Sequence, residues 1–173
     1  LQIIQDKGLQ KSFYTKHGLP TAPYTLLSNL QEVLAGISNG DIIYPFVQKS
    51  CTAGYDGKGV AVIRNANDIP KLLEGACVIE QLIDFEKELA VIVSRDLDGK
   101  TTCFPAVEME FHPVANLVEF LLAPAFISDE AAAKAKKIAE DCISAFGLTG
   151  ILAVEMFLTK SGDILINEVA PRP

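Results

Sequence analysis

Features typical of membrane and secreted proteins are missing from this sequence of 173 residues. There is no run of 18 apolar residues and no signal peptide, and charged residues already appear at Asp6, Lys7 and Lys11. We therefore expect a soluble chain that makes no contact with a membrane. Repeats and low-complexity segments are also absent. Hydrophobic residues make up 49% of the chain, which is ordinary for a globular protein with one core or two lobes.

An excess of basic residues and a zinc-binding cysteine pattern are also lacking. The formal net charge of −7 argues against nonspecific binding to nucleic acid. Cys51, Cys77, Cys103 and Cys142 form no C-x-x-C pair, which favours reduced thiols in a cytoplasmic protein over disulfides. Neighbouring lysine charge is expected to lower the pKa of the Cys51 thiol. No histidine base is related to Cys51 in sequence, so we interpret it as a bystander.

The last quarter of the chain predicts a β-hairpin with two acidic residues opposite each other. Within residues 151–172, two apolar runs flank a polar turn at 160–163. If the turn has an even number of residues, Glu155 and Glu168 face each other on adjacent strands. Two carboxylates in an apolar setting repel each other unless a cation such as Mg²⁺ lies between them. The alternative is that one glutamate lies at the sheet edge and reaches into water. The same-face neighbours predicted for the pair are Ile151, Ala153, Phe157, Ile164 and Ile166.

The rest of the pattern predicts an α+β fold, in which a small αβ part precedes a larger, mostly antiparallel sheet with one long helix. Helices are expected over residues 6–17, over 29–35 with Ser28 as N-cap, over 68–73 with Asn67 as N-cap, and from Ser128 to about Phe146 before Gly147. Strands are expected over 44–49, 60–63, 76–81, 88–94 and 101–107, and residues 108–127 are expected to be mostly extended.

A glycine-rich segment from Lys49 to Gly59 joins two of the predicted strands. Gly54, Gly57 and Gly59 allow backbone N–H groups to converge on an anion, and Lys49 and Lys58 add positive charge. A nucleotide triphosphate suits this arrangement, although the segment matches neither the Walker A pattern nor the dinucleotide fingerprint. The alternative is a hairpin loop whose lysines only keep it in solution.

Two further segments have both a functional and a structural interpretation. The strand end at residues 78–83 could stack a flat base and pair with its edge, but from the sequence alone a core strand is the better interpretation. Glu88 begins the next strand and could accept hydrogen bonds from ribose hydroxyls, or could simply be solvated there.

Taken together, these segments resemble an ATP-grasp domain, and specifically the ATP-dependent carboxyaminoimidazole ribonucleotide synthetases of de novo purine synthesis. The resemblance covers nearly the whole chain. Gly54-Tyr-Asp-Gly-Lys-Gly59 is typical of this branch, and the two carboxylate strands are typical of ATP-grasp enzymes in general. The other matching segments are Gln10-Lys11, Gly18-Leu-Pro-Thr-Ala-Pro23, Val47-Gln-Lys49, Val78-Ile-Glu-Gln81, Ala153-Val-Glu-Met-Phe157 and Ile166-Asn-Glu-Val-Ala-Pro-Arg172.

The resemblance implies an ATP-grasp fold of two lobes with a nucleotide cleft between them. The small lobe, residues 1–77, would hold the phosphate loop, and the larger lobe, 78–173, would hold the metal carboxylates. The implied enzyme is an ATP-dependent carbon–nitrogen ligase that uses ATP and Mg²⁺. Its substrates would be aminoimidazole ribonucleotide and bicarbonate, and the parent protein would be a homodimer. In the family reaction, bicarbonate is phosphorylated to carboxyphosphate, whose CO₂ is captured by the amine, which leaves ADP and phosphate.

The same resemblance implies the role of each site residue. Lys7 and Lys49 would contact the ATP phosphates, and Gly54, Gly57 and Gly59 would close over them. The adenine would be held by Glu80, Gln81, Leu82 and Ile83, and the ribose by Glu88. Glu155 and Glu168 would carry Mg²⁺, with Asn167 beside them. The implied catalytic residues on the substrate side are Tyr55, Asp56, Lys58 and Arg172.

The sequence departs from the family pattern in several places. Ala53 stands where the family often has a second glycine, and the Glu-Asn-x-His pattern reads Glu108-Met-Glu-Phe111 with His112 one place later. The family's leading αβ domain and its trailing His-Asn-Ser-Gly-His stretch are not in the sequence. We therefore expect an ATP-grasp core with weak or absent turnover. The alternatives are another ATP-grasp carboxylase or formyl ligase, or a nucleotide-binding module that is inactive in isolation.

Overall fold

The computed structural model describes residues 2–52, 59–111 and 118–172. The chain forms two compact units: unit 1 comprises Leu1–Phe13 and Ala22–Leu82, and unit 2 comprises Tyr14–Thr21 and Ile83–Pro173. The boundary that we placed between residues 77 and 78 falls inside strand β4 (Cys77–Gln81), which lies wholly in unit 1 because it pairs with two other strands there.

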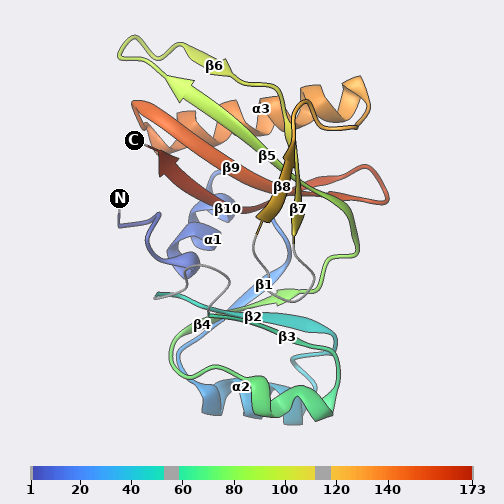
Figure 1. Ribbon diagram of the computed structural model, residues 1–173. Helices are drawn as coiled ribbons and strands as arrows, with labels where there is room; N and C mark the ends of the chain where they lie inside the picture. Colours follow the sequence, from blue (N-terminus) through green and yellow to red (C-terminus); the bar gives the residue numbers. More distant parts are fainter. Residues whose placement is uncertain (1, 53–58, 112–117, 173) are drawn as a thin grey trace. The chain divides into compact units, whose positions relative to one another are not determined.

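Unit 1 is built on a four-stranded antiparallel sheet with the order β1-β4-β2-β3 (Figure 1). Its elements are α1 (Lys7–Lys16, whose last three residues belong to unit 2), β1 (Tyr24–Leu27), α2 (Leu30–Asn39), β2 (Phe46–Ser50), β3 (Val60–Ile63), the 3₁₀ helix η1 (Ala66–Lys71) and β4. The core includes Val33 of α2 together with Phe46, Ile63, Cys77 and Ile79 of the strands. One face of the sheet is therefore closed by α2, which leaves the other face for a site.

Two short helices of unit 1 begin at residues other than the predicted ones. The N-cap of α2 is Asn29 and not Ser28: Asn29 Oδ1 accepts a hydrogen bond of 2.9 Å from Glu32 N, and the Glu32 carboxylate accepts one of 2.8 Å from Ser28 N. This arrangement resembles a capping box, except that the glutamate accepts from the residue before the N-cap. The N-cap of η1 is Asn65 and not Asn67, because Asn65 Oδ1 accepts from the backbone N–H two residues on.

Unit 2 is built on a six-stranded antiparallel sheet with the order β10-β9-β5-β7-β8, in which β6 also pairs with β5. Its elements are β5 (Phe85–Arg95), β6 (Thr101–Cys103), β7 (Val107–Phe111), β8 (Val118–Leu122), α3 (Asp129–Phe146), β9 (Gly150–Thr159) and β10 (Ile164–Arg172). The predicted α+β architecture is confirmed, as are the α3 caps Ser128 and Gly147. The single strand predicted over 101–107 is wrong. It breaks into β6 and β7 around Pro105, which has no N–H to donate to a ladder.

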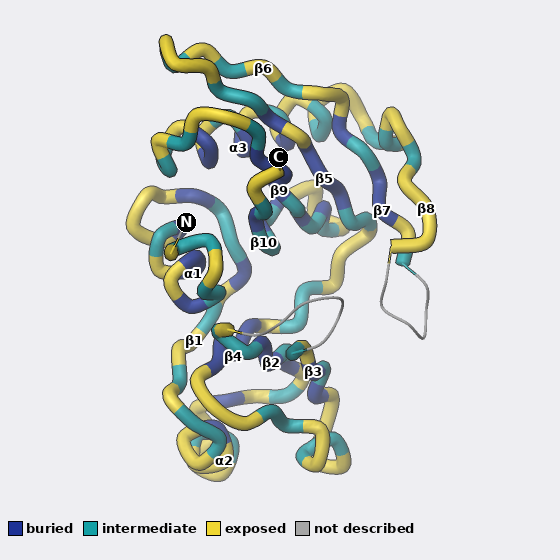
Figure 2. The backbone as a smooth tube through the Cα atoms, turned by 60° about the vertical axis from the view of Figure 1, so that its left-hand side comes forward, coloured by how far each residue is buried: buried dark blue, intermediate teal, exposed yellow. Residues whose placement is uncertain are grey.

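The core of unit 2 lies between its sheet and α3. The large apolar side chains of β5 and β9 occupy every second position, and the small residues Ala90 and Ala153 between them are also buried, so both strands show dark segments in Figure 2. The side chains buried on this face are Leu89, Val91, Val93, Leu152, Val154, Met156 and Leu158, and α3 contributes Ala135, Ile138, Ala139, Cys142 and Ile143. The polar residues of the same strands therefore point to the opposite face.

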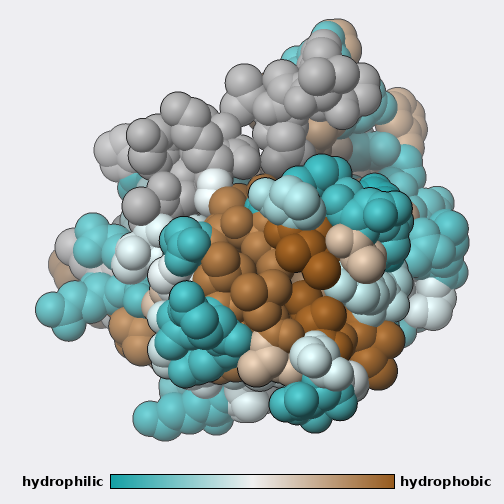
Figure 3. All heavy atoms as spheres, turned by 90° about the horizontal axis from the view of Figure 1, so that it is seen from below, coloured by the Kyte–Doolittle hydropathy of each residue, from teal (hydrophilic) through white to brown (hydrophobic). Residues whose placement is uncertain are grey.

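Apolar side chains are not confined to the two cores. The view from below in Figure 3 shows a cluster of apolar residues on the molecular surface. The large apolar side chains that remain exposed on and just after α2 are Leu34 and Ile43, at 39% and 77% exposure. No helix in the described part of the chain has the length and apolar character needed to cross a membrane. All four cysteines are free thiols.

Candidate functional site

Glu155 and Glu168 lie directly opposite each other on β9 and β10, so the predicted pairing is confirmed. The reason is different from the one we gave. Ile166 pairs with Met156 and Glu168 pairs with Glu155, so Asn167 is an extra residue in β10 and forms a β-bulge. Ile164 pairs with Leu158, so the turn between them has an odd number of residues, which alone would not align the two carboxylates. The extra residue in β10 restores their alignment.

The bulge also changes which residues share a face with the carboxylates. Ile164 and Ile166 were predicted on that face, but both are buried on the opposite one, and Ile164 is paired with Leu158. Ile166 and Val169 are both buried although they are three positions apart, a spacing that a regular strand does not allow. This spacing of apolar residues was the sequence signal for the bulge. The residues paired on the carboxylate side are Ala153 with Ala170, Phe157 with Leu165, and Ile151 with Arg172.

The same face of the unit 2 sheet carries Glu88. This residue pairs with Phe157 on β9, and two positions further along β5 Ala90 pairs with Glu155. Successive residues of a strand alternate between faces, so Glu88, Glu155 and Glu168 lie on one face, from three adjacent strands. All three are half-buried. The fold thus brings together the residues predicted for the ribose and for the metal.

The carboxylate pair fits a hard cation that takes its remaining ligands from elsewhere. Among the described residues, no three histidine, cysteine, aspartate or glutamate side chains converge as a metal cluster. A closed all-protein cage is therefore not present in this part of the chain. Mg²⁺ is commonly held by one or two carboxylates together with water and substrate phosphate oxygens, and Glu155 with Glu168 meets that requirement.

Pro20 and Thr21 form hydrogen bonds with β10 beside the bulge. Ile166 N donates a hydrogen bond of 2.8 Å to Pro20 O, and Thr21 Oγ1 donates one of 2.9 Å to Ile166 O. Thr21 and Ile166 also form an isolated parallel bridge. Part of the segment Gly18–Pro23 thus supports the strand that carries Glu168, a role that the sequence did not suggest for it.

In unit 1, a cluster of three charged side chains lies on the sheet face opposite α2. Lys49 of β2 and Glu80 of β4 are diagonal neighbours on this face, since Lys49 pairs with Val78 and Val47 pairs with Glu80. Lys49 Nζ donates a hydrogen bond of 3.1 Å to Glu80 Oε2. The side chain of Glu80 is 3% exposed, so its carboxylate interacts with groups inside the protein.

Lys11 is the third member of the cluster. Its Nζ lies 3.2 Å from Glu80 Oε1, at ion-pair distance. Burial lowers the pKa of Lys11 to about 8; Glu80 opposes this decrease, whereas Lys49 and Lys7 add to it. Sequence reasoning noted Lys11 only as part of a matching segment, because a contact between α1 and β4 cannot be read from spacing.

The N-terminus of α1 is attached to the end of β2, where the glycine-rich segment begins. Lys7 N donates a hydrogen bond of 2.9 Å to Cys51 O, and Leu9 N donates one of 2.9 Å to Asp6 Oδ1. Gly8 permits this approach, because a Cβ at that position would lie 3.1 Å from Cys51 Sγ. Lys7 is thereby placed beside the first residues of the predicted phosphate loop.

Of the loop itself, Gly59 is described. It has a φ of +78°, and its carbonyl accepts a hydrogen bond of 2.9 Å from Ser50 N. The other loop residues named from the sequence lie outside the described part of the chain, as does His112. They are Gly54, Tyr55, Asp56, Gly57 and Lys58.

The remaining predicted residues fall in separate places. Gln81 is exposed at the end of β4, and its N–H donates to Pro23 O. Leu82 ends unit 1, and Ile83 begins the longer segment of unit 2. Arg172 is exposed on β10.

Two other sequence features behave differently from expectation. The pKa of the Cys51 thiol is raised, mainly by burial and then by Asp6, so the expected decrease is wrong. Glu108, where the sequence departs from the family pattern, is buried on the α3 face and forms an ion pair of 2.6 Å with Lys87. It therefore points away from the carboxylate face.

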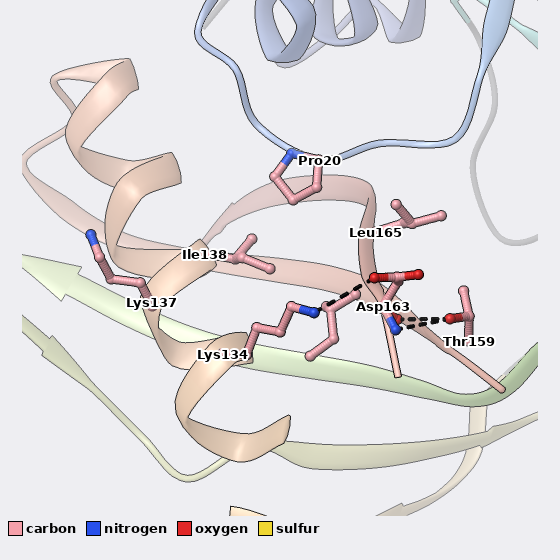
Figure 4. A pocket seen from close by; sticks show the side chains of 8 residues that line it. Pro20, Lys134, Lys137, Ile138, Thr159, Asp163 and Leu165 are labelled. Atoms are coloured by element: carbon pink, nitrogen blue, oxygen red, sulfur yellow. Dashed lines mark hydrogen bonds and ion pairs between the residues drawn. The ribbon is translucent and has the colours of Figure 1, made fainter. Parts of the chain in front are cut away.

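A pocket of about 400 Å³ lies in unit 2 between α3 and the β9–β10 turn (Figure 4). Lys134 on one wall forms an ion pair of 3.7 Å with Asp163 on the other, and Pro20, Ile138 and Leu165 contribute apolar surface. None of the described residues predicted for nucleotide or metal binding lines this pocket. The candidate residues of each unit therefore lie on its own sheet and not here.

Comparison with known proteins gives a consistent result. Residues 12–173 match the ATP-grasp domain family. The chain is 40% identical to the phosphoribosylaminoimidazole carboxylase of Candida glabrata over 176 residues, which is 99% of this chain and 30% of the relative.

Two solved structures extend the comparison. An ADP complex of N5-carboxyaminoimidazole ribonucleotide synthetase superposes with a TM-score of 0.91 at 39% identity and covers 99% of this chain and 46% of its own. The enzyme from Aspergillus clavatus with ADP and 5-aminoimidazole ribonucleotide gives a TM-score of 0.85 at 28% identity, covering 98% and 44%. The chain thus spans between 30% and 46% of the length of these proteins.

Proposed function

This chain belongs to the ATP-grasp family, and from that premise we propose that it binds ATP with Mg²⁺ as the nucleotide-binding core of a carboxylating ligase. The observation that carries the proposal is the direct pairing of Glu155 with Glu168 on a face that also holds Glu88. An acidic face of this kind needs a cation to approach a polyphosphate, and Mg²⁺ would reconcile the two.

In unit 1, the proposal assigns the phosphates to the lysines. Lys49 is the more exposed cation of the buried cluster, and Lys7 stands at the start of the glycine-rich segment. Lysine binds phosphate as a point charge, and glycine-rich backbone adds N–H donors. Gly54, Gly57 and Gly59 are proposed to supply those donors. The strand end formed by Glu80, Gln81 and Leu82, together with Ile83, is proposed to bind the adenine.

In unit 2, the proposal assigns Mg²⁺ to Glu155 and Glu168, with Asn167 beside them and Glu88 bound to the ribose. The ion, when bound, would neutralise charge on the phosphate oxygens during transfer. The carboxylates hold it, and the half-buried apolar neighbours of the pair limit competition from water. Tyr55, Asp56, Lys58 and Arg172 are proposed to act on the substrate side.

The proposed reaction begins with attack by a bicarbonate oxygen on the γ-phosphorus of ATP, which breaks the bond to the β-phosphate oxygen and releases ADP. The carboxyphosphate so formed loses phosphate to give CO₂, and the amine of aminoimidazole ribonucleotide captures the CO₂ and loses a proton. Phosphoryl transfer of this kind depends on positioning and charge neutralisation more than on a protein nucleophile. The ADP and aminoimidazole ribonucleotide in the Aspergillus clavatus complex support this choice of ligands.

Calorimetric titration of ATP into this chain, with Mg²⁺ and with EDTA, tests the proposal. Binding is expected with Mg²⁺ and is expected to weaken at least about tenfold in the Glu155→Gln/Glu168→Gln variant, because that variant loses both carboxylate ligands. Any weak turnover that the core retains is expected to release more ADP when aminoimidazole ribonucleotide and bicarbonate are added, which tests the acceptor.

The matched control is Glu110→Gln/Glu119→Gln, which removes two exposed carboxylates from β7 and β8 of the same sheet. Equal losses in both double variants would indicate a general charge effect and contradict the metal assignment. Absence of ATP binding by the folded wild-type chain would overturn the proposed function.

A further inference from the structure

We propose that the pocket between α3 and the β9–β10 turn binds a small zwitterion with an apolar side group, that is, a free apolar amino acid. All the residues that line this pocket belong to unit 2. The inference does not depend on the proposed nucleotide function, because none of the described residues assigned to ATP or Mg²⁺ lines the pocket.

The size and the walls of the pocket suit such a molecule. Its volume of about 400 Å³ lies within the range of small-molecule sites. Pro20, Ile138, Ile164 and Leu165 provide apolar surface. The side group of an amino acid such as phenylalanine would therefore be removed from water there, which favours binding.

One basic and one acidic side chain face each other across the pocket. Figure 4 shows Lys134 of α3 pointing towards Asp163 of the turn. Lys134 Nζ lies 3.7 Å from Asp163 Oδ1, which is beyond hydrogen-bond distance, and the two side chains are 46% and 67% exposed. An exposed ion pair of this length contributes little stability, so a ligand can separate its members at small cost.

Both charged groups have room for a ligand group. An ammonium group has three N–H donors, and within the described segments Lys134 Nζ donates one hydrogen bond, of 3.2 Å, to Gly162 O. Asp163 Oδ2 accepts a hydrogen bond of 2.9 Å from Ser161 Oγ, and Oδ1 faces Lys134. The carboxylate of an amino acid would pair with Lys134 and its ammonium group with Asp163, so the charges of ligand and pocket are complementary.

Molecules with a single charge fit this pocket less well. A simple carboxylate would meet the negative charge of Asp163, and a simple amine would meet the positive charge of Lys134. Lys137 also lines the pocket, but it forms an ion pair with Asp141, and its ammonium end points away from Asp163 in Figure 4. Lys137 therefore serves as an internal control for Lys134.

The pocket adjoins a hydrogen bond that reports on its occupancy. Pro20 lines the pocket, and its carbonyl accepts a hydrogen bond of 2.8 Å from Ile166 N. A ligand in contact with Pro20 is therefore expected to shift the amide resonance of Ile166 as well as those of Lys134 and Asp163.

NMR titration of the full chain with phenylalanine, up to about 10 mM, tests the proposal. Saturable shifts are expected at Lys134, Asp163 and Ile166, and no shifts are expected in β3 of unit 1. Two matched compounds separate the charges, since hydrocinnamate keeps only the carboxylate and phenethylamine keeps only the amine. Each is expected to bind at least about threefold more weakly than phenylalanine, and alanine is also expected to bind more weakly because it has little apolar surface.

Two variants and one control assign the charges. Lys134→Met is expected to weaken phenylalanine at least about threefold without weakening phenethylamine. Asp163→Asn is expected to weaken phenylalanine to a similar extent without weakening hydrocinnamate. Lys137→Met is expected to bind phenylalanine within about 1.5-fold of wild type. Thermal denaturation identifies a variant that does not fold, and in that case the other variant and the two matched compounds decide.

Three outcomes would overturn the proposal: no shifts at the pocket, equal affinity for the three aromatic compounds, or equal losses in Lys134→Met and Lys137→Met. Titration of ATP with Mg²⁺ into the same samples separates this inference from the proposed function. Binding of phenylalanine without binding of ATP would support the pocket and refute the nucleotide function. Binding of ATP without binding of phenylalanine would refute the pocket alone.

Discussion

The burial of Lys11 gives unit 1 a stability that depends on pH. Its pKa is lowered from 10.5 to about 8, so between these two values the unfolded chain binds more protons than the folded chain. The free energy of unfolding therefore increases as the pH rises through this window, and the full cost of burying the charge is present below pH 8. A methionine at this position has no such dependence.

We accordingly predict that wild type gains about 2 kcal/mol of stability relative to Lys11→Met between pH 7.5 and pH 10. Urea unfolding of both proteins at the two pH values measures the change. The other titrating groups are shared, so the contribution of those that do not interact with Lys11 cancels in the difference. A constant difference across the range would contradict the assignment of a lowered pKa to Lys11.

Individual residues show what the sequence could and could not reveal. The opposition of Glu155 and Glu168 was predicted because strand pairing is local to a hairpin, but the bulge at Asn167 was missed and the predicted side of Ile166 was wrong. The contact of Lys11 with Glu80 joins positions about seventy residues apart, and no periodicity encodes it. Burial reversed the pKa shift expected for Cys51, which sequence charge alone did not anticipate.

At the level of elements, the bulge in β10 is expected to affect the proposed metal site more than the stability of the fold. Ile166 already pairs with Met156 and Glu168 with Glu155, so deletion of Asn167 would join two registers into one regular ladder. We predict that the deletion variant keeps its thermal midpoint to within about 2 °C. Magnesium-dependent ADP affinity is expected to fall about tenfold, because the extra residue no longer orients the Glu168 carboxylate.

Asn167→Ala separates the side chain from the backbone in this experiment. An equal loss in both variants would assign the effect to the amide side chain, and a loss in the deletion alone would assign it to the bulge. Thermal denaturation and calorimetry supply the two readouts. Unfolding of the hairpin on deletion, or unchanged affinity in both variants, would contradict the prediction.

The α2 cap offers a test of a boundary that the sequence misplaced by one residue. Asn29→Ala removes the acceptor for Glu32 N and is expected to lower the free energy of unfolding by about 1 kcal/mol. Ser28→Ala is the matched control, and it is expected to cost less than about 0.5 kcal/mol because only the backbone N–H of Ser28 takes part. Chemical denaturation of both variants measures the difference, and the reverse order would restore Ser28 as the cap.

Most elements followed from the sequence because their signals are local. α3 was found with both of its caps, since Ser128 and Gly147 stand at the ends of a clear apolar period. The break between β6 and β7 was missed because strand limits depend on the partner: β6 pairs with the end of β5 and β7 with its beginning.

At the scale of the whole molecule, the two units differ in charge. Unit 1 has six lysines and arginines and seven aspartates and glutamates, a net charge of −1, whereas unit 2 has nine and fifteen, a net charge of −6. An acidic unit that is proposed to act on a polyphosphate requires a cation to reduce the repulsion, and the nearly neutral unit requires it less.

Ligand binding to the proposed site should therefore stabilise the whole chain in a magnesium-dependent way. At a hundredfold excess over the dissociation constant, ATP with Mg²⁺ is expected to add about 2.7 kcal/mol. For a chain of this size, that gain raises the thermal midpoint by roughly 5–10 °C. A thermal-shift assay measures it, and Glu155→Gln/Glu168→Gln should lose most of the increase. An equal increase with EDTA would argue against a metal on these carboxylates.

The attachment of Pro20 and Thr21 to β10 has a consequence for self-association. β10 is an edge strand of the unit 2 sheet, and an open edge is a template onto which the strand of another chain can add. The outer side of β10 is occupied at Ile166 by this segment, and Pro171 has no N–H to offer further along. A strand from another molecule would find no continuous row of partners there. The same two residues that support the strand of Glu168 therefore also protect it against aggregation.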